Sequence, residues 1–194
     1  MVNPDRSRIG GPGETVEIDE TFVGGIRSKA RGGRSPLGKA VVAIAVDARP
    51  GRVRLERLPN TAKDTMTEFV LSNVERASIV HTDAYAGYND LGRYDFRHTL
   101  TNMSSADALD AHVSMPHAHR VASLLKRWLL GTHQGGMSRE QLDYYLDEFT
   151  FRFNRRQSAS RGLLFYRLVE GAVATPPKPY KDLKAGSDRL FRVS

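Results

Sequence analysis

The run from Ala40 to Val46 is apolar at every position, and it limits the possible folds more than any other stretch of the chain. A strand with one buried face alternates apolar and polar residues, whereas an unbroken apolar run is typical of a strand covered on both faces. The run is far too short to cross a bilayer. The segment 39–48 is therefore predicted to be the buried central strand of a sheet.

Two further segments predict the neighbours of this strand. Residues 15–23 are rich in β-branched side chains, and residues 52–58 alternate apolar and charged side chains after a turn. We expect these strands and the central one to form an antiparallel meander. The segment 61–74 follows, with Thr61 as the expected cap and apolar residues at helical spacing, so it predicts a helix.

The remaining elements are shorter strands and then helices. We expect strands at 78–83 and 96–102, a short helix or turn at 85–91, a loop at 103–116, and helices at 119–130, 138–156 and 160–174. This order predicts an α/β fold, an RNase H-like mixed β-sheet flanked by helices, with a helical C-terminal layer.

We expect one domain over residues 14–174, with a disordered lead-in at 1–13 and a loose tail at 175–194. The chain has no cysteine, which excludes a disulfide framework and a cysteine-based zinc site within it. The N-terminus lacks the apolar segment of a secretory signal, so the cytoplasm is the expected location. The formal net charge of +7 favours a polyanionic partner such as nucleic acid.

Two aspartates lie at positions in the predicted sheet where functional side chains are common. Asp19 is in the middle of the predicted strand 15–23, where an acid is costly unless it serves a site. The alternative is a solvent-facing position beside Glu17 and Thr21. Asp83 closes the predicted strand 78–83, and sites gather at the carboxyl ends of such strands. The alternative for Asp83 is the cap of the turn that follows.

Together the two carboxylates predict a site for divalent cations. Phosphoryl transfer on DNA uses two divalent ions a few Å apart, and Mg²⁺ takes oxygen ligands. Asp19 and Asp83 can supply such ligands from separate strands if the strands converge.

Four segments in order give the chain a specific resemblance over residues 14–174. It resembles the ISXO-like group of DDE insertion-sequence transposases in VEIDETFVGG (16–25), HTDAYAGY (81–88), RVASLLKRWLLGTHQG (120–135) and LDEFTFRFNRR (146–156). The resemblance implies metal-dependent DNA cleavage and strand transfer of an insertion sequence, with a two-metal site of Mg²⁺ or Mn²⁺. It also implies transposon-end and target DNA as partners and a homo-oligomer on the DNA.

The resemblance assigns four residues to the catalytic site. Asp19 and Asp83 match the first two metal-binding acids, His119 the third active-site position, and Lys126 a downstream basic residue. His119 and Lys126 are seven residues apart, so on a helix they point the same way. The alternative is an ordinary solvated helix face.

His119 departs from the Glu or Asn that is commonest at this position of the family. Imidazole is a poor ligand for Mg²⁺ and a better one for Mn²⁺ or zinc. His119 could ligate a metal, hydrogen-bond a phosphate, or shuttle a proton. The fallback carboxylates are Glu20, Asp107 and Asp110, and we interpret His112 and His117 as loop histidines.

Basic residues in two regions are the expected DNA contacts, because phosphates bind Lys and Arg without regard to sequence. The alternative is a solvated charged surface. The first region is the Gly-rich stretch 24–39, with Arg27, Lys29, Arg31, Arg34 and Lys39; the second comprises Arg127, Arg152, Arg155 and Arg156.

Members of the family usually carry an N-terminal zinc ribbon, and often a helix-turn-helix, before the catalytic core. About 14 residues precede the first predicted strand, so we expect an N-terminally truncated or mis-started chain. Three hypotheses follow: a transposase catalytic core, a catalytically impaired DNA-binding remnant of a transposase, or another RNase H-like nuclease such as a junction resolvase.

Overall fold

Two compact units make up the chain, one of Ser7–Gly136 and one of Met137–Ser194 together with Met1–Arg6. The computed structural model describes residues 7–24, 39–49, 51–83, 85–101, 115–133, 139–177 and 179. The first unit contains the sheet and both predicted metal-binding aspartates. The predicted extent of the domain, residues 14–174, includes parts of both units and stays a prediction.

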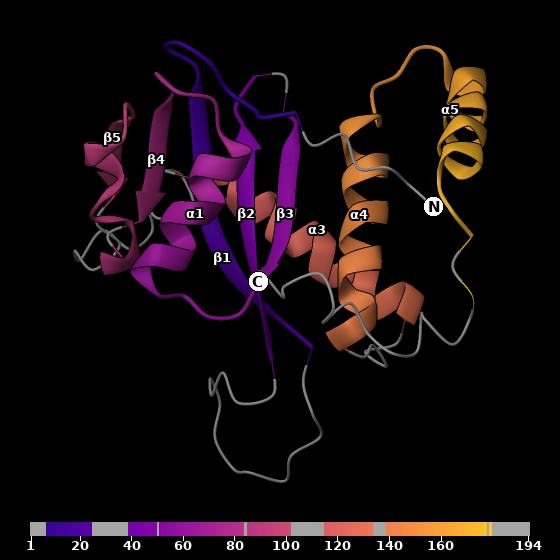
Figure 1. The fold of residues 1–194 in the computed structure, drawn as a ribbon, viewed down its shortest axis with the longest axis horizontal. Coiled ribbons are helices and arrows are strands. Elements are labelled where there is room, and N and C mark those ends of the chain that lie inside the picture. Colours follow the sequence, from indigo (N-terminus) through magenta and orange to yellow (C-terminus); the bar gives the residue numbers. More distant parts are fainter. Residues whose placement is uncertain are drawn as a thin grey trace, which may run out of the picture. The chain divides into compact units, whose positions relative to one another are not determined.

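A five-stranded mixed sheet organises the first unit (Figure 1). Its strands are β1 (Thr15–Val23), β2 (Ala40–Asp47), β3 (Val53–Leu58), β4 (Ile79–Asp83) and β5 (Arg97–Thr101), in the order β3-β2-β1-β4-β5. The first three strands pair antiparallel, as the sequence predicts, while β4 runs parallel to both β1 and β5. This order confirms the expected RNase H-like sheet.

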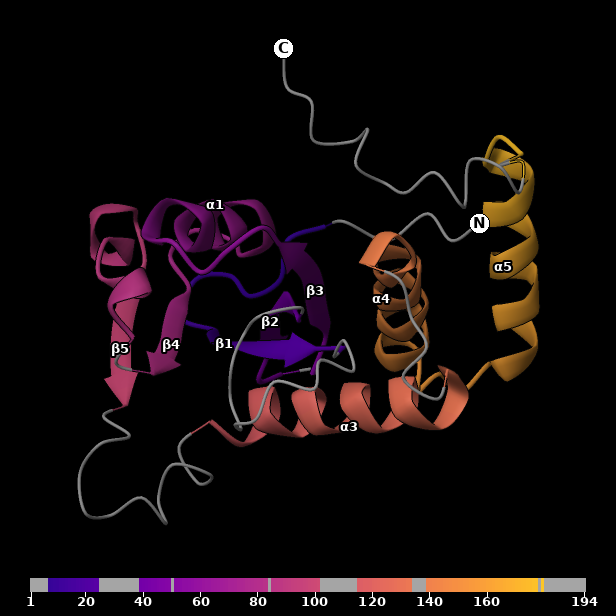
Figure 2. The same ribbon diagram turned by 90° about the horizontal axis from the view of Figure 1, so that it is seen from below.

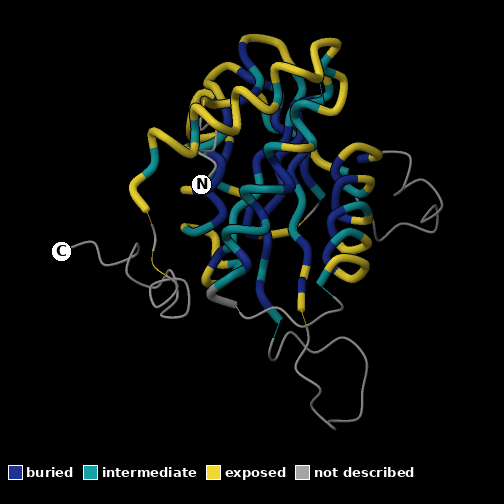
Figure 3. Tube along the Cα trace, turned by 90° about the vertical axis from the view of Figure 1, so that its right-hand side faces the viewer, coloured by how far each residue is buried: buried dark blue, intermediate teal, exposed yellow. Residues whose placement is uncertain are grey.

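The apolar run predicted to be a central strand is β2. It pairs with β1 on one side and β3 on the other, and Val42, Ala43, Ile44 and Ala45 are 0% exposed. The dark-blue strands at the middle of the sheet in Figure 3 show this burial. Burial on both faces explains why no polar residue interrupts the run.

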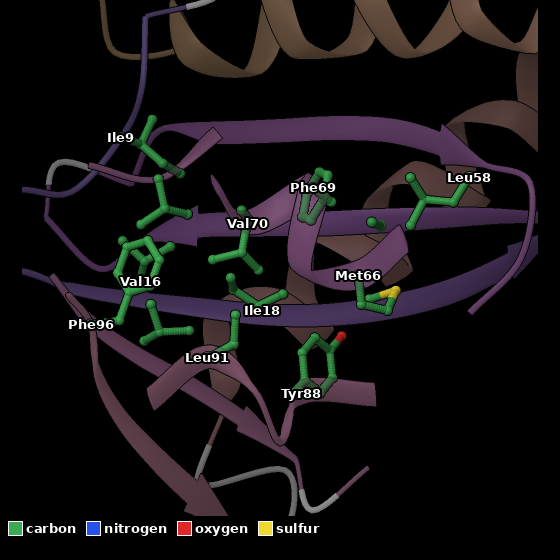
Figure 4. Close-up of a cluster of buried hydrophobic side chains, with 14 residues drawn as sticks. Ile9, Val16, Ile18, Leu58, Met66, Phe69, Val70, Tyr88, Leu91 and Phe96 are labelled. Atoms are coloured by element: carbon green, nitrogen blue, oxygen red, sulfur yellow. The ribbon is translucent and has the colours of Figure 1, made fainter. Parts of the chain in front are cut away.

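Helices cover the two faces of the sheet. Helix α1 (Lys63–Asn73) lies on one face and α3 (Pro116–His133) on the other (Figure 2). Met66, Phe69 and Val70 of α1 pack with Val16 and Ile18 of β1 in the main core (Figure 4). Because side chains alternate along a strand, the residues between them on β1 face α3.

The remaining elements follow the predicted order with shifted boundaries. Short 3-10 turns η1 (Ala86–Tyr88) and η2 (Leu91–Arg93) occupy the segment expected to be a helix or turn. Helix α3 begins at Pro116, before the predicted start. Proline is well suited to the first position of a helix, where no N–H is needed.

The predicted cap at Thr61 is wrong. Helix α1 begins after Ala62 without a side-chain cap. Asn60 Oδ1 instead accepts the Ala62 N–H at 2.8 Å and the Thr65 hydroxyl at 2.9 Å. The Thr61 hydroxyl lies 3.1 Å from the Tyr85 hydroxyl, so it joins the helix to the segment after β4.

The predicted disorder of the lead-in is wrong for Ser7–Gly13. Ile9 is 1% exposed, donates its N–H to Asn73 O at 2.9 Å and accepts the Glu75 N–H at 2.8 Å. Arg54 Nε donates to Ser7 O at 2.9 Å. Gly10 has φ +83°, and a Cβ there would lie 2.6 Å from Ser78 Oγ, so this segment requires glycine.

The second unit is helical, as predicted. It contains α4 (Arg139–Asn154) and α5 (Arg161–Ala174). Of the expected loose tail, only 175–177 and 179 are among the described residues. None of the helices that the structure describes is long and apolar enough to cross a membrane.

Candidate active site

Asp19 lies in a covered position of β1. The alternative of a solvent-facing stretch is wrong, because Glu17 and Thr21 on the same face are 4% and 5% exposed. The side chain of Asp19 is 16% exposed, and its Oδ1 accepts the Glu20 N–H at 2.8 Å. An acid at this depth requires a compensating charge or hydrogen bond.

Asp83 is the last residue of β4, next to the same part of β1. Ile18 pairs with Thr82 in the parallel register, so Asp19 and Asp83 occupy the next position on each strand. Paired residues of parallel strands point to the same face, which brings the two carboxylates near each other. Asp83 Oδ1 also accepts the Tyr85 N–H at 3.1 Å, so the alternative role at the turn is present as well.

Helix α3 brings His119 to these acids. Its Nε2 lies 3.6 Å from Asp19 Oδ2, and the side chain is 21% exposed. Lys126 is exposed on the same helix, and its charge lowers the pKa of Asp19. Asp83, His119 and Lys126 therefore each lie near Asp19. The helix is oriented by its buried side, which comprises Ala118, Val121, Ala122, Leu125 and Leu129.

Burial and repulsion raise the pKa values of two neighbouring carboxyls on β1, those of Asp19 and Glu20. The pKa of Asp19 rises to about 6, chiefly because burial disfavours its charge; the Glu20 N–H lowers it and Asp83 raises it further. The pKa of Glu20 rises to about 7, again chiefly through burial, against a lowering hydrogen bond from Tyr88. Crowded carboxyls with raised pKa values are typical of functional sites and favour a bound cation.

Tyr88, to which the sequence analysis assigned no role, binds Glu20 on the face of β1 that packs against α1. Its side chain is 0% exposed and its hydroxyl donates to Glu20 Oε2 at 2.8 Å. In Figure 4 its ring is grouped with core residues such as Ile18 and Met66. A sequence signal for Tyr88 was present, because it is the last residue of the motif HTDAYAGY (81–88) that also contains Asp83.

Glu17 and His117 were also missed. Glu17 Oε1 lies 2.7 Å from His117 Nδ1, and Glu17 Oε2 accepts the N–H groups of His117 and Ala118. The interpretation of His117 as a loop histidine is wrong, since Pro116 already begins α3. The sequence offers no direct signal, because the two residues are 100 positions apart.

The donor set fits a divalent cation that accepts both oxygen and nitrogen. Asp19 and Asp83 supply carboxylates and His119 an imidazole, a combination that suits Mn²⁺ better than Mg²⁺. Within the part of the chain that the structure describes, no three His, Asp or Glu residues are grouped closely enough to hold a metal as they stand. The fallback residues Asp107 and Asp110, and His112, lie outside the described residues.

The predicted DNA contacts divide between described and undescribed residues. Arg27, Lys29, Arg31 and Arg34 lie outside the described residues. Lys39, just before β2, is half-buried, while Arg127 on α3 is exposed.

Three more predicted DNA contacts lie in or after α4 and interact locally. Arg152 pairs with Glu148 at 3.0 Å. The guanidinium carbons of Arg155 and Arg156 lie 4.1 and 4.0 Å from the ring centroids of Phe151 and Phe153. Stacking of this kind holds a guanidinium in place while leaving its edge able to bind a phosphate.

The fold and site define an RNase H-like domain with two carboxylates at neighbouring parallel strands. Residues 11–154 match the family model described as the ISXO2-like transposase domain. This chain belongs to that transposase family. The match covers all four of the predicted site residues Asp19, Asp83, His119 and Lys126.

Two further similarities accompany the family match. An uncharacterized transposase-like protein of Haemophilus influenzae is 28% identical over 116 residues, which are 60% of this chain and 92% of that protein. The other is to a chain in the cryo-EM structure of the simian T-cell lymphotropic virus intasome in complex with the PP2A regulatory subunit B56 gamma. That similarity has 14% identity and a TM-score of 0.43, and covers 78% of this chain but only 52% of the other.

Proposed function

We propose that this chain is the catalytic core of an insertion-sequence transposase, which cuts DNA and transfers a strand by phosphoryl transfer. The observation that supports the proposal is that Asp83 of β4 and His119 of α3 each lie near Asp19 of β1. Asp19 and Asp83 follow the Ile18/Thr82 pair of β1 and β4, and His119 Nε2 of α3 lies 3.6 Å from Asp19 Oδ2. Family membership supports the same function.

The reaction consists of two exchanges at phosphorus. In cleavage, a water oxygen bonds to phosphorus and the bond to the 3′ oxygen breaks, which frees a 3′-hydroxyl. In strand transfer, that hydroxyl oxygen bonds to a target phosphorus and a target P–O bond breaks. No redox partner is needed, so positioning and charge stabilisation account for most of the catalysis.

Asp19, Asp83 and His119 would hold Mg²⁺ or Mn²⁺ at this point. When bound, such ions lower the pKa of the attacking oxygen and stabilise charge on the leaving one. At neutral pH, Asp19 is largely ionised, since its pKa is about 6. The exposed ammonium of Lys126, which is close enough to lower that pKa, orients the phosphate.

The basic residues would hold the DNA by its phosphates. Arg127 on α3 and Arg152, Arg155 and Arg156 at the end of α4 supply charge without reading bases. The partners in this proposal are the transposon ends and the target, on which the protein acts as a homo-oligomer.

The test is a strand-transfer assay with a pre-cut oligonucleotide of the element's end, a supercoiled target and either Mn²⁺ or Mg²⁺. Asp83→Asn keeps the shape of the side chain, and we expect it to lower product by at least about a hundredfold. Asp95→Asn is the matched control, because Asp95 is exposed and outside the site. A wild type and an Asp83→Asn variant with equal activity would refute the proposed catalytic site.

Two observations favour a second candidate, a DNA-binding remnant without catalysis. The described residues contain no three-residue metal group, and a histidine stands at the third position. In the same assay this function predicts binding that persists in every variant and no product with either metal. Four-way junction DNA, added as a further substrate, tests for a junction-cleaving nuclease.

A further inference from the structure

Glu17 makes an unusual set of contacts for a residue in the middle of a sheet. It is 4% exposed, and its Oε2 accepts the His117 N–H at 2.9 Å and the Ala118 N–H at 2.8 Å. Its Oε1 lies 2.7 Å from His117 Nδ1. These three contacts provide the hydrogen bonds that a buried carboxylate needs.

The backbone groups that Glu17 binds belong to the first turn of α3. A helix leaves its first N–H groups without partners inside the helix, and a side-chain oxygen just before the helix usually accepts them. Met115 precedes Pro116 and has no such oxygen. Glu17 therefore caps α3 from a strand, and its negative charge lies at the positive end of the helix dipole.

This cap is next to the predicted catalytic contact between Asp19 and His119. Glu17 and Asp19 are two residues apart on the same face of β1, and His117 and His119 are two residues apart at the start of α3. Glu17 Oε1 meets His117 Nδ1 at 2.7 Å, and Asp19 Oδ2 faces His119 Nε2 at 3.6 Å. The first contact fixes the helix start along the strand, and the second depends on where that start lies.

We propose that Glu17 is a positioning residue of the active site, which anchors the start of α3 to β1 so that His119 faces Asp19. The proposal rests on the proposed function for its importance, but the anchoring itself is independent of DNA and metal. It assigns Glu17 no contact with substrate. It predicts that loss of the carboxylate disrupts the His119–Asp19 geometry while the sheet stays folded.

The experiment measures this geometry by NMR, without metal or DNA. The ring signals of His119 are identified by their loss in His119→Gln, and their change on Asp19→Asn measures the coupling of the two residues. In the Glu17→Ala background we expect this change to be at least about threefold smaller. An undiminished change would overturn the proposal.

Control and rescue variants distinguish positioning from general loss of structure. Thr21→Val is the matched control, because Thr21 is 5% exposed and lies two residues beyond Asp19 on the same face. It should leave the coupling intact. Glu17→Gln keeps an oxygen that can accept a backbone N–H, so it should restore part of the coupling.

If Glu17→Ala does not fold, Glu17→Gln and His117→Ala carry the test. The His117 side chain is 46% exposed, so we expect the protein to fold when this side chain is truncated. Each should reduce the coupling, and an unchanged coupling in both would overturn the proposal.

The strand-transfer assay adds a functional readout. Folded Glu17 variants should transfer strands at least about tenfold more slowly than Thr21→Val. A wild type without product would refute the proposed function, while the NMR coupling would still decide the role of Glu17. Reduced coupling with unchanged strand transfer would show that the anchor has no part in catalysis, and this would overturn its role as a positioning residue.

Discussion

The imidazole of His119 lies beside the carboxylate of Asp19, with 3.6 Å between Nε2 and Oδ2. The two residues come from different layers, β1 of the sheet and α3 on its face. The pKa of Asp19 is raised to about 6, chiefly by burial. A cation bound beside Asp19 would lower its pKa again, because a positive charge opposes both the burial and the repulsion from Asp83 that raise it.

The nature of the third ligand should set the metal preference. We expect His119→Glu to shift strand transfer toward Mg²⁺, because a carboxylate oxygen suits Mg²⁺ and imidazole suits Mn²⁺. The ratio of product in Mg²⁺ to product in Mn²⁺ should rise by about tenfold or more. His119→Gln is the control, since it removes the imidazole without adding charge. An unchanged ratio in His119→Glu would show that this position does not ligate the metal.

Asp19→Asn should stabilise the metal-free protein at neutral pH. The folded pKa of Asp19, about 6, is above the ordinary value of 3.8, so ionising it costs the folded state free energy. That cost is absent below the ordinary pKa and grows as pH rises through 6. The shift of the Asp19 pKa from 3.8 to about 6 corresponds to a loss of about 3 kcal/mol at most in the free energy of unfolding.

Urea unfolding with a chelator present measures this effect. The difference between Asp19→Asn and wild type should shrink from about pH 7.5 to about pH 4, where both side chains are neutral in the folded state. Asp95→Asn, at an exposed position, should show no such trend. With Mn²⁺ added, the wild type should gain stability that Asp19→Asn does not. A variant less stable than wild type in the chelator would contradict the prediction.

Much of the sheet could be predicted from local patterns. The unbroken run in β2 reflects burial on both faces, which the structure confirms, and the residue types of the segments 15–23 and 52–58 correctly predicted β1 and β3 as its neighbours. The lead-in could not be predicted, because Ile9 is a lone apolar residue among Gly, Pro and Arg. Its burial depends on Asn73 and Glu75, which are far away in sequence.

The site shows the same division between local and long-range signals. The positions of Asp19 within β1 and of Asp83 at the end of β4 could be predicted, because each has a local signature on its strand. The cap from Glu17 to His117 and Ala118 joins residues about 100 positions apart, and no spacing rule connects them. Tyr88 belongs to the motif HTDAYAGY, but the motif does not reveal its partner Glu20, which is 68 residues earlier in the chain.

Gly87 should tolerate no side chain, although its backbone is ordinary. A Cβ there would lie 2.5 Å from Cε1 of the Tyr85 ring and 3.3 Å from Thr61 O. The ring is held by a hydrogen bond from its hydroxyl to Thr61 O at 3.0 Å, so it cannot move without loss. We expect Gly87→Ala to destabilise the fold by about 1–3 kcal/mol.

The matched control for Gly87 is Gly92, which also lies in a 3-10 turn. A Cβ at Gly92 meets no atom within 4 Å. Gly92→Ala should therefore change the free energy of unfolding by less than about 0.5 kcal/mol in urea titrations. Equal effects of the two substitutions would show that crowding against Tyr85 is not the cause.

Tyr88→Phe should destabilise the protein more at high pH than at low pH. The hydroxyl donates to Glu20 Oε2 at 2.8 Å, and the pKa of Glu20 is raised to about 7, chiefly by burial. Above that pKa the lost bond is one to a charged group, worth about 1.5–3 kcal/mol. Near pH 5.5 Glu20 is neutral in the folded protein, so we expect Tyr88→Phe to lower the free energy of unfolding by only about 1 kcal/mol or less.

Urea unfolding of Tyr88→Phe in a chelator at about pH 8 and about pH 5.5 provides the comparison. The Glu20→Gln background is the control, because it removes the charge that the hydroxyl stabilises. There the effect of Tyr88→Phe should be the same at both pH values. Because the hydroxyl lowers the pKa of Glu20, its loss should raise that pKa above 7, which NMR titration of the Glu20 carboxyl can follow. A larger loss of stability at low pH would show that the hydroxyl stabilises the neutral acid instead.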